Sequence, residues 1–135
     1  MEPEFQELIT AAVAARKQAY APYSHFAVGA ALLTASNEVI LGCNVENASY
    51  GLTICAERSA IFTAIGQGHT KFQAIAISLK GSGSPCGACR QVLNEFAPES
   101  IVIMADEEGL NVRQTNLAQL LPEAFGPINL QSQSL

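Results

Sequence analysis

The sequence predicts an α/β protein, a three-layer α/β/α sandwich with a five-stranded mixed sheet between layers of helices. Two observations predict this fold class. Segments with helical periodicity alternate along the chain with short apolar runs, which is the pattern of helices packed on both faces of a sheet. The chain is also 49% hydrophobic, enough for a substantial core, and its 135 residues suit one domain that spans 1–135.

The first half of the chain predicts a helix, a pair of strands and a second helix. Apolar residues recur at helical spacing over residues 3–19, and the sequence APYS ends this helix. FAVGAALLT (26–34) and EVILGCN (38–44) are rich in alanine and β-branched residues and are separated by ASN, as in a hairpin. CAERSAIFTAIGQG (55–68) predicts a second helix, which its glycines end.

The second half predicts three more strands and two more helices. FQAIAISL (72–79) is typical of a buried strand, and CGACRQVLNEFA (86–97) predicts a third helix that begins after a proline. IVIMA (101–105) predicts a strand, and LNVRQT, after the turn DEEG, predicts a weaker one. NLAQLLPEAF (116–125) predicts a last helix with Asn116 as its cap, and the tail after it has little pattern.

The order of these elements predicts how the strands run. The second strand, second helix and third strand form a βαβ unit, so the two strands are expected to be parallel, with a right-handed crossover. Their carboxyl ends then share one edge of the sheet, where the second and third helices begin and where open α/β sheets bind ligands. The fourth and fifth strands are joined by too few residues for a crossover helix and are expected to be antiparallel.

Charge and hydropathy argue against several function classes. The net charge of -5 disfavours a nucleic-acid partner, because phosphate contacts need a basic surface. No apolar run approaches the roughly 20 residues of a transmembrane helix, and the acidic start MEPEFQELIT is unlike a signal peptide. We therefore expect no nucleic acid, no membrane and a cytoplasmic location, where four unevenly spaced cysteines are metal ligands or free thiols rather than disulfides.

Three cysteines stand at the starts of predicted helices. Cys55 opens the second helix, and Cys86 and Cys89, in SPCGACR, open the third. Alone, a Pro-Cys-x-x-Cys also fits a redox dithiol or half of a structural zinc site. The predicted topology brings all three thiols to one edge of the sheet, where they would supply three ligands to a tetrahedral zinc and leave the fourth position open, as in catalytic sites. Helix N-termini also favour the thiolate form.

Glu57 and Arg58, which follow shortly after Cys55, are candidates for supporting roles. Glu57 would place a carboxylate beside a zinc-activated water, which makes it a candidate proton shuttle. Arg58 shares the helix face of Cys55, and a donor to the thiolates would offset their negative charge; an ordinary surface arginine is the alternative. Cys43 lies in a strand run and is interpreted as a small buried residue.

The run CAE, followed by PCGAC, resembles the zinc deaminases, in which three cysteines, or a histidine and two cysteines, hold the metal beside a glutamate that is not a ligand. Over nearly its whole length the chain is similar to the cytidine deaminases of the small, all-cysteine type. The segments that carry the resemblance are YAPYSHFAVGAAL, GCNVENASYGLTICAERSAIF, SPCGACRQVLNEF and LLPEAF.

The resemblance implies one zinc per chain, held by Cys55, Cys86 and Cys89. It implies that Glu57 is the proton shuttle and that Arg58 contacts the ligand sulfurs. The activity it implies is zinc-dependent hydrolytic deamination of cytidine and 2'-deoxycytidine to uridine and 2'-deoxyuridine with release of ammonia, a step of pyrimidine salvage.

The resemblance also implies the substrate contacts. Phe26 matches an aromatic residue at the pyrimidine, Asn44 and Glu46 match a pair that binds the ribose hydroxyls, and Tyr50 matches a residue near the sugar. Phe125 matches an aromatic residue that enters a neighbouring subunit's site, which implies a homotetramer with shared active sites. Without the resemblance, Asn44 and Glu46 are read as strand-end loop residues, and Phe26 and Phe125 as core residues.

Two other functions remain as alternatives. One is a deaminase of a related aminopyrimidine nucleoside such as blasticidin S, although NVENASYG matches the ribose-binding stretch and favours cytidine. The other is a structural zinc or redox module without enzyme activity. Three ligands beside a glutamate argue against a structural zinc site, and the lack of a thioredoxin-like strand-CxxC-helix near the N-terminus argues against a redox module.

Overall fold

A computed structural model describes residues 2–131 and contains one five-stranded sheet with the strand order β2-β1-β3-β4-β5. The strands are β1 Val28–Thr34, β2 Val39–Cys43, β3 Phe72–Leu79, β4 Ile101–Ala105 and β5 Arg113–Asn116. The helices are α1 Pro3–Arg16, α2 Ala56–Gly66, α3 Gly87–Phe96, α4 Leu117–Leu120 and α5 Pro127–Gln131, with a short 3-10 helix at Tyr50–Leu52. Among the described helices, none is long and apolar enough to cross a membrane.

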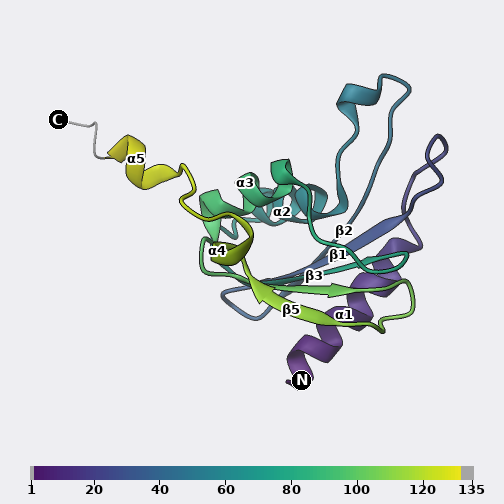
Figure 1. Cartoon of the computed structure of the whole chain (residues 1–135), viewed down its shortest axis with the longest axis horizontal. Helices are drawn as coiled ribbons and strands as arrows, with labels where there is room; N and C mark the ends of the chain where they lie inside the picture. Colours follow the sequence, from purple (N-terminus) through teal and green to yellow (C-terminus); the bar gives the residue numbers. More distant parts are fainter. Residues whose placement is uncertain (1, 132–135) are drawn as a thin grey trace.

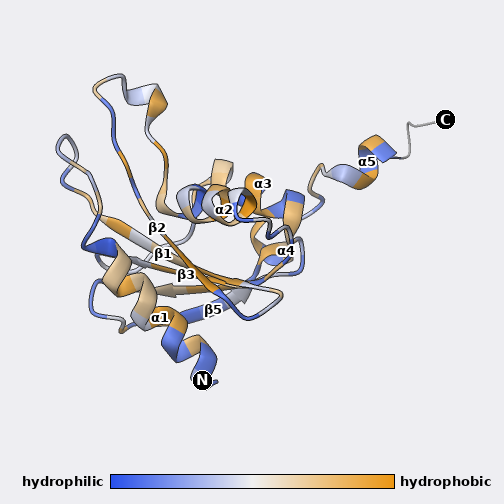
Figure 2. Cartoon of the chain, turned by 180° about the vertical axis from the view of Figure 1, so that it is seen from behind, coloured by the Kyte–Doolittle hydropathy of each residue, from blue (hydrophilic) through white to orange (hydrophobic). Residues whose placement is uncertain are grey.

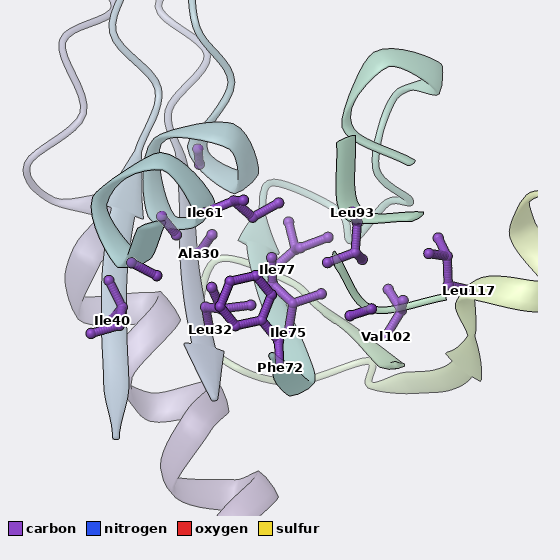
Figure 3. Packing of buried hydrophobic residues seen from close by; sticks show 14 of the residues in the cluster. Ala30, Leu32, Ile40, Ile61, Phe72, Ile75, Ile77, Leu93, Val102 and Leu117 are labelled. Carbon is purple, nitrogen blue, oxygen red and sulfur yellow. The ribbon is translucent and has the colours of Figure 1, made fainter. Parts of the chain in front are cut away.

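Helices cover both faces of the sheet, which confirms the predicted α/β sandwich (Figure 1). On one face, α1 packs on β1, β2 and β3, and Leu8, Ile9 and Ile103 are fully buried between the layers. On the other face, α2 and α3 enclose a second cluster that includes Ile61 and Ile77 (Figure 3). Figure 2 shows apolar segments along the central strands, whereas the edge strand β5 is hydrophilic. Each fully buried aliphatic side chain stabilises the fold by roughly 1.5–3 kcal/mol.

The strand directions follow the prediction, with one strand inserted. β1 pairs antiparallel with both β2 and β3, so β2 and β3 are parallel to each other with β1 between them. β3 and β4 are parallel neighbours, and β4 and β5 are antiparallel. Because Gly29 pairs with Cys43 and Val28 with Leu79, the carboxyl ends of β2 and β3 lie at one edge of the sheet, as expected.

The first and last predicted helices differ most from the structure in their limits. The first ends at Arg16 instead of residue 19. The last does not run over 116–125: α4 is four residues long, and Leu121 after it leaves the helical region. The reason is Pro122, which excludes the preceding residue from the α region and has no N–H to donate. Asn116 does cap α4, with its side chain accepting a hydrogen bond from the Gln119 N–H at 3.0 Å.

The tail also differs from the sequence-based expectation. It contains a second short helix, α5, which the pattern of the sequence does not predict. The first strand likewise begins at Val28 instead of residue 26, because Phe26 pairs with loop side chains and not with a neighbouring strand.

Gly42 allows the first turn of α2 to lie directly against β2. A Cβ atom at this position would stand 2.4 Å from the Ala56 carbonyl oxygen and 2.5 Å from the Ala60 nitrogen, and backbone atoms cannot yield as a flexible side chain does. Any added methyl group therefore moves α2 away from the sheet, together with the residues at its start.

We therefore predict that Gly42→Ala lowers the free energy of unfolding by about 3 kcal/mol, at the upper end of overpacking costs. Urea unfolding followed by circular dichroism measures the change. Gly66→Ala is the matched control, because a Cβ there meets no atom within 4 Å and the same substitution in α2 should be neutral or slightly stabilising. Equal stability of the two variants would contradict the close contact between β2 and α2.

Candidate active site and metal centre

The three predicted ligand cysteines come together at the starts of two helices. Cys55 is the N-cap of α2, Cys86 is the N-cap of α3, and Cys89 lies in the first turn of α3. The Sγ atoms of Cys55 and Cys86 are 3.8 Å apart, those of Cys86 and Cys89 are 3.4 Å apart, and all three lie within 4.8 Å of one another. A tetrahedral zinc with Zn–S bonds of about 2.3 Å separates its sulfurs by about 3.8 Å, so the cluster fits this ion.

Charge at the cluster also fits a cation. Hydrogen bonds from Cys89 and from Arg58 lower the pKa of Cys55 to about 5, while the bond with Cys55 and burial raise the pKa of Cys89. The Cys55 thiolate is thus stabilised, while the neighbouring Cys89 is held in its protonated thiol form. A metal cation among the sulfurs would stabilise all three thiolates together. Arg58 has the predicted position, with Nη2 donating to Cys55 Sγ at 3.4 Å.

Glu57 is buried beside this cluster. Its side chain is 6% exposed and lines the same cavity as Cys55 and Cys86. Burial raises the pKa of Glu57 to about 7, because a charged carboxylate is poorly solvated there, and a bound cation would lower this pKa by attraction. The carboxyl group therefore lies where it can exchange a proton with water or a ligand bound in the cavity.

A cavity of about 340 Å³ opens onto the cysteine cluster and is within the size range of small-molecule sites. Three of the predicted substrate contacts, Phe26, Asn44 and Glu46, line it. Tyr50 lines an adjoining cavity of about 240 Å³, which shares Glu46 with the first, and its ring lies 5.8 Å from that of Tyr23. The loops that carry these residues extend from the same end of the sheet (Figure 1).

Phe125 is not among the residues that line this cavity. It follows α4 on the segment that leads to α5, and its side chain is 60% exposed. Its carbonyl oxygen accepts hydrogen bonds from Gln91 Nε2 at 2.8 Å and from Asn94 Nδ2 at 3.4 Å, so α3 holds the segment while the ring faces outwards. The predicted role of Phe125 in a neighbouring subunit's site requires a second copy of the chain and stays a prediction.

The structure also identifies Arg90, a residue that the sequence analysis missed. Its Nε donates to the Pro85 carbonyl oxygen at 2.8 Å, its Nη2 to Ser84 Oγ at 3.0 Å and its Nη1 to the Leu120 carbonyl oxygen at 2.8 Å. The guanidinium therefore fixes the loop that precedes Cys86 and joins it to the end of α4. The sequence did contain a signal for this role, because Arg90 is a charged residue directly after PCGAC in a helix that is otherwise half-buried.

Comparison with known proteins agrees with this site. Residues 3–105 match the family model described as the cytidine and deoxycytidylate deaminase zinc-binding region. Cytidine deaminase from Halalkalibacterium halodurans is 48% identical over 123 residues, which cover 89% of this chain and 92% of the relative. The enzyme from Sporosarcina psychrophila is 43% identical over 129 residues, covering 94% and 95% of the two chains.

Solved structures give the same result. The crystal structure of cytidine deaminase from Burkholderia pseudomallei superimposes with a TM-score of 0.86 at 51% identity and covers 93% of this chain and 100% of its own. That of cytidine deaminase from Mycobacterium leprae has a TM-score of 0.78 at 40% identity, covering 90% and 100%. The chain therefore belongs to the cytidine deaminase family of zinc-binding hydrolases, and Cys55, Cys86 and Cys89 form the metal triad of its zinc-binding region.

Proposed function

We propose that this protein deaminates cytidine and 2'-deoxycytidine to uridine and 2'-deoxyuridine with release of ammonia, using one zinc per chain. The observation that carries the proposal is the shared cavity. The cysteine cluster and the buried Glu57 carboxyl open onto the same space as Phe26, Asn44 and Glu46. The two bacterial relatives described above, both cytidine deaminases, support the choice of reaction.

Glu57 is the residue that moves protons in the proposed reaction. A zinc ion held by Cys55, Cys86 and Cys89 would supply Lewis-acid chemistry and lower the pKa of a bound water towards neutral pH. Glu57 accepts a proton from the attacking water, whose oxygen adds to C4 of the ring, and delivers that proton to N3. It then transfers the second proton of the same water to the exocyclic amino group, which leaves as ammonia while the C4 carbonyl forms.

Arg58 and the two helix starts offset the charge of the ligands. Three thiolates around a zinc dication carry a net charge of -1, which weakens the site as a Lewis acid. The Arg58 guanidinium, within hydrogen-bond distance of Cys55 Sγ, withdraws electron density from one thiolate. The N-termini of α2 and α3 add partial positive charge at Cys55 and Cys86.

The lining of the cavity favours a nucleoside over a nucleotide. Glu46 and Glu57 are the charged residues among those that line it, and no lysine or arginine is among them. A 5'-phosphate or a polynucleotide backbone would meet a negative wall without a basic partner. Asn44 and Glu46 instead offer amide and carboxylate groups that suit sugar hydroxyls.

The experiment that tests this proposal is an ultraviolet assay of the zinc-loaded protein on five compounds in parallel. Cytidine and 2'-deoxycytidine should be turned over, whereas cytidine 5'-monophosphate and free cytosine should be poor substrates. Blasticidin S as the fifth compound tests the alternative enzyme. Turnover of cytosine as fast as cytidine would contradict the sugar-reading role of Glu46, and preference for blasticidin S would overturn the proposed substrate.

We further propose that the active form is a homotetramer in which Phe125 of one copy completes the cavity of another. The support is the exposed apolar character of the segment around α5, which extends away from the sheet and its helices (Figure 1). The side chains of Phe125, Ile128 and Leu130 are 60%, 76% and 63% exposed. A segment of this kind buries its apolar surface only against another chain.

Phe125→Ser is therefore expected to lower kcat/KM about tenfold or more and to shift the sedimentation coefficient below that of a tetramer. Burial of one phenylalanine stabilises a contact by about 1.5–3 kcal/mol, which corresponds to this loss. Leu110→Ser is the matched control, because Leu110 is 58% exposed in the β4–β5 turn, outside this segment. A fully active monomer in sedimentation velocity at assay concentration would rule out the assembly.

A further inference from the structure

We propose that Ser24 is a positioning residue, whose hydroxyl joins the Glu46 carboxylate to the backbone of Phe26 and so couples the sugar side of the cavity to the aromatic ring on its base side. The substrate roles of Glu46 and Phe26 belong to the proposed function. The hydrogen bonds that join the two residues do not depend on it.

The Glu46 carboxylate accepts three hydrogen bonds from the loop that precedes β1. Its Oε1 accepts hydrogen bonds from the Tyr23 N–H at 3.0 Å and the Ser24 N–H at 3.1 Å, and its Oε2 accepts one from Ser24 Oγ. The bond from the Ser24 hydroxyl lowers the pKa of Glu46, so the carboxylate is ionised at neutral pH. An ionised carboxylate has about four acceptor positions, which leaves one on Oε2 for a ligand hydroxyl.

The Ser24 hydroxyl has a second partner on the other side. While it donates to Glu46, the same Oγ accepts a hydrogen bond from the Phe26 N–H at 3.0 Å. The Phe26 carbonyl oxygen accepts a hydrogen bond from Asn44 Nδ2 at 2.7 Å. Both backbone polar groups of Phe26 are therefore hydrogen-bonded to side chains, and one of these, Ser24, is itself hydrogen-bonded to Glu46.

His25, between these two residues, makes the arrangement depend on its anchors. Its φ angle of 58° lies in the left-handed region, which is uncommon for a residue other than glycine and which surrounding contacts must maintain. The His25 N–H donates to the Ala21 carbonyl oxygen at 3.0 Å, which closes the turn. Without the Ser24 hydroxyl, the chain can relax at His25 and carry the Phe26 ring with it.

The link predicts how sugar recognition affects the ring. A hydroxyl bound to Oε2 of Glu46 competes with Ser24 Oγ for the same oxygen or aligns it, and either change reaches the Phe26 N–H through one atom. Glu46 and Phe26 therefore contribute to binding together, and their energies should not add independently.

The first test is steady-state kinetics on the zinc-loaded protein. Ser24→Ala should raise KM for cytidine about tenfold while kcat changes little, as expected for loss of a hydrogen bond to a charged group that serves ground state and transition state alike. Ser24→Thr keeps the hydroxyl and should restore KM. Ser36→Ala is the matched control, because the Ser36 hydroxyl likewise donates to a glutamate carboxylate. That glutamate is Glu38, at 3.3 Å, and the pair lies at the opposite end of the sheet.

The second test separates coupling from a simple structural effect. In a Phe26→Ala background, Ser24→Ala should raise KM much less than it does in the unchanged protein, because the residue that Ser24 positions is gone. The chain has no tryptophan, so Phe26→Trp provides a single tryptophan, excited selectively over the three tyrosines, as a reporter at the ring. Adding Ser24→Ala should lower its fluorescence anisotropy through faster local motion, and adding Ser36→Ala should not.

The outcomes are distinct. Unchanged KM and unchanged anisotropy in Ser24→Ala would overturn the proposal, as would a lower kcat and melting temperature at constant KM, which indicate general destabilisation. Equal effects of Ser24→Ala with and without Phe26 would overturn the coupling. If the protein does not act on cytidine, the anisotropy measurement still tests the link, so failure of the proposed function is distinguishable from failure of this inference.

Discussion

Replacing Cys86 with alanine is expected to remove zinc from the protein and to reduce cytidine turnover to background. Cys86 Sγ lies 3.8 Å from Cys55 Sγ and 3.4 Å from Cys89 Sγ, so it is part of the same compact cluster of three sulfurs. Two thiolates with two open positions bind zinc far more weakly than three. Loss of a residue that only supports a ligand already costs roughly 10–100-fold in metal affinity, and loss of a ligand itself should exceed that range.

The effect should extend to stability. Without the cation, the paired thiols at the starts of α2 and α3 lose the interaction that joins the two helices at this edge, and metal binding contributes directly to folding free energy where the site forms only in the folded chain. We therefore also expect a lower melting temperature for Cys86→Ala, equal to that of the unchanged protein after treatment with a chelator.

The measurement is zinc content after dialysis against a weak chelator, on the same preparation used for the assay. Cys43→Ala is the control, because the Cys43 thiol donates to the Gln18 carbonyl oxygen at 3.5 Å and is not part of the cluster. It should retain one zinc per chain. A Cys86→Ala protein that keeps its full complement of zinc would show that the ligand assignment is wrong.

The convergence of these cysteines could be predicted from the sequence because it follows from topology. Once the strands that precede Cys55 and Cys86 are recognised as parallel, their carboxyl ends must share an edge, whether or not another strand lies between them. The structure inserts β1 between β2 and β3 without changing that result. Glu57 and Arg58 lie two and three residues after Cys55 at the start of α2, so their place near the cluster also follows from the local sequence.

The parts that could not be predicted depend on contacts between distant segments. Ser24 meets Glu46 across 22 residues, and Arg90 reaches Leu120 across 30. Such contacts require the exact packing of loops that carry no periodic pattern. The apolar repeat in NLAQLLPEAF favoured one helix, and the local effect of Pro122 overrode that repeat. Asn44 illustrates both cases: its place at the cavity followed from the resemblance, whereas its hydrogen bonds to the Phe26 carbonyl and the Val28 N–H did not.

Glu57→Gln is expected to lower cytidine turnover by about 10⁴-fold or more while zinc stays bound. A positioned acid or base usually contributes about 10²–10⁴-fold, and here one carboxyl serves twice, once at the water and N3 and once at the leaving amino group. The amino group leaves slowly unless it is protonated, and attack at C4 is slow unless N3 gains a proton. Among residues that line the cavity, no histidine offers a second route for these protons.

Glutamine has nearly the shape of glutamate, so the variant changes the proton chemistry and little else. Glu57 is 6% exposed, and burial opposes its charged form, so removal of the charge should not lower the free energy of unfolding. Glu95→Gln is the matched control, because it makes the same chemical change at an exposed position of α3 and should leave turnover unchanged.

Zinc content, sedimentation and turnover are measured together on one preparation of each variant. Loss of zinc along with activity in Glu57→Gln would make Glu57 a ligand or a structural residue. Turnover within tenfold of the unchanged protein would assign proton transfer to another group and overturn the proposed mechanism. Only inactive, folded and zinc-loaded protein supports Glu57 as the proton shuttle, because that combination separates catalysis at this site from metal binding.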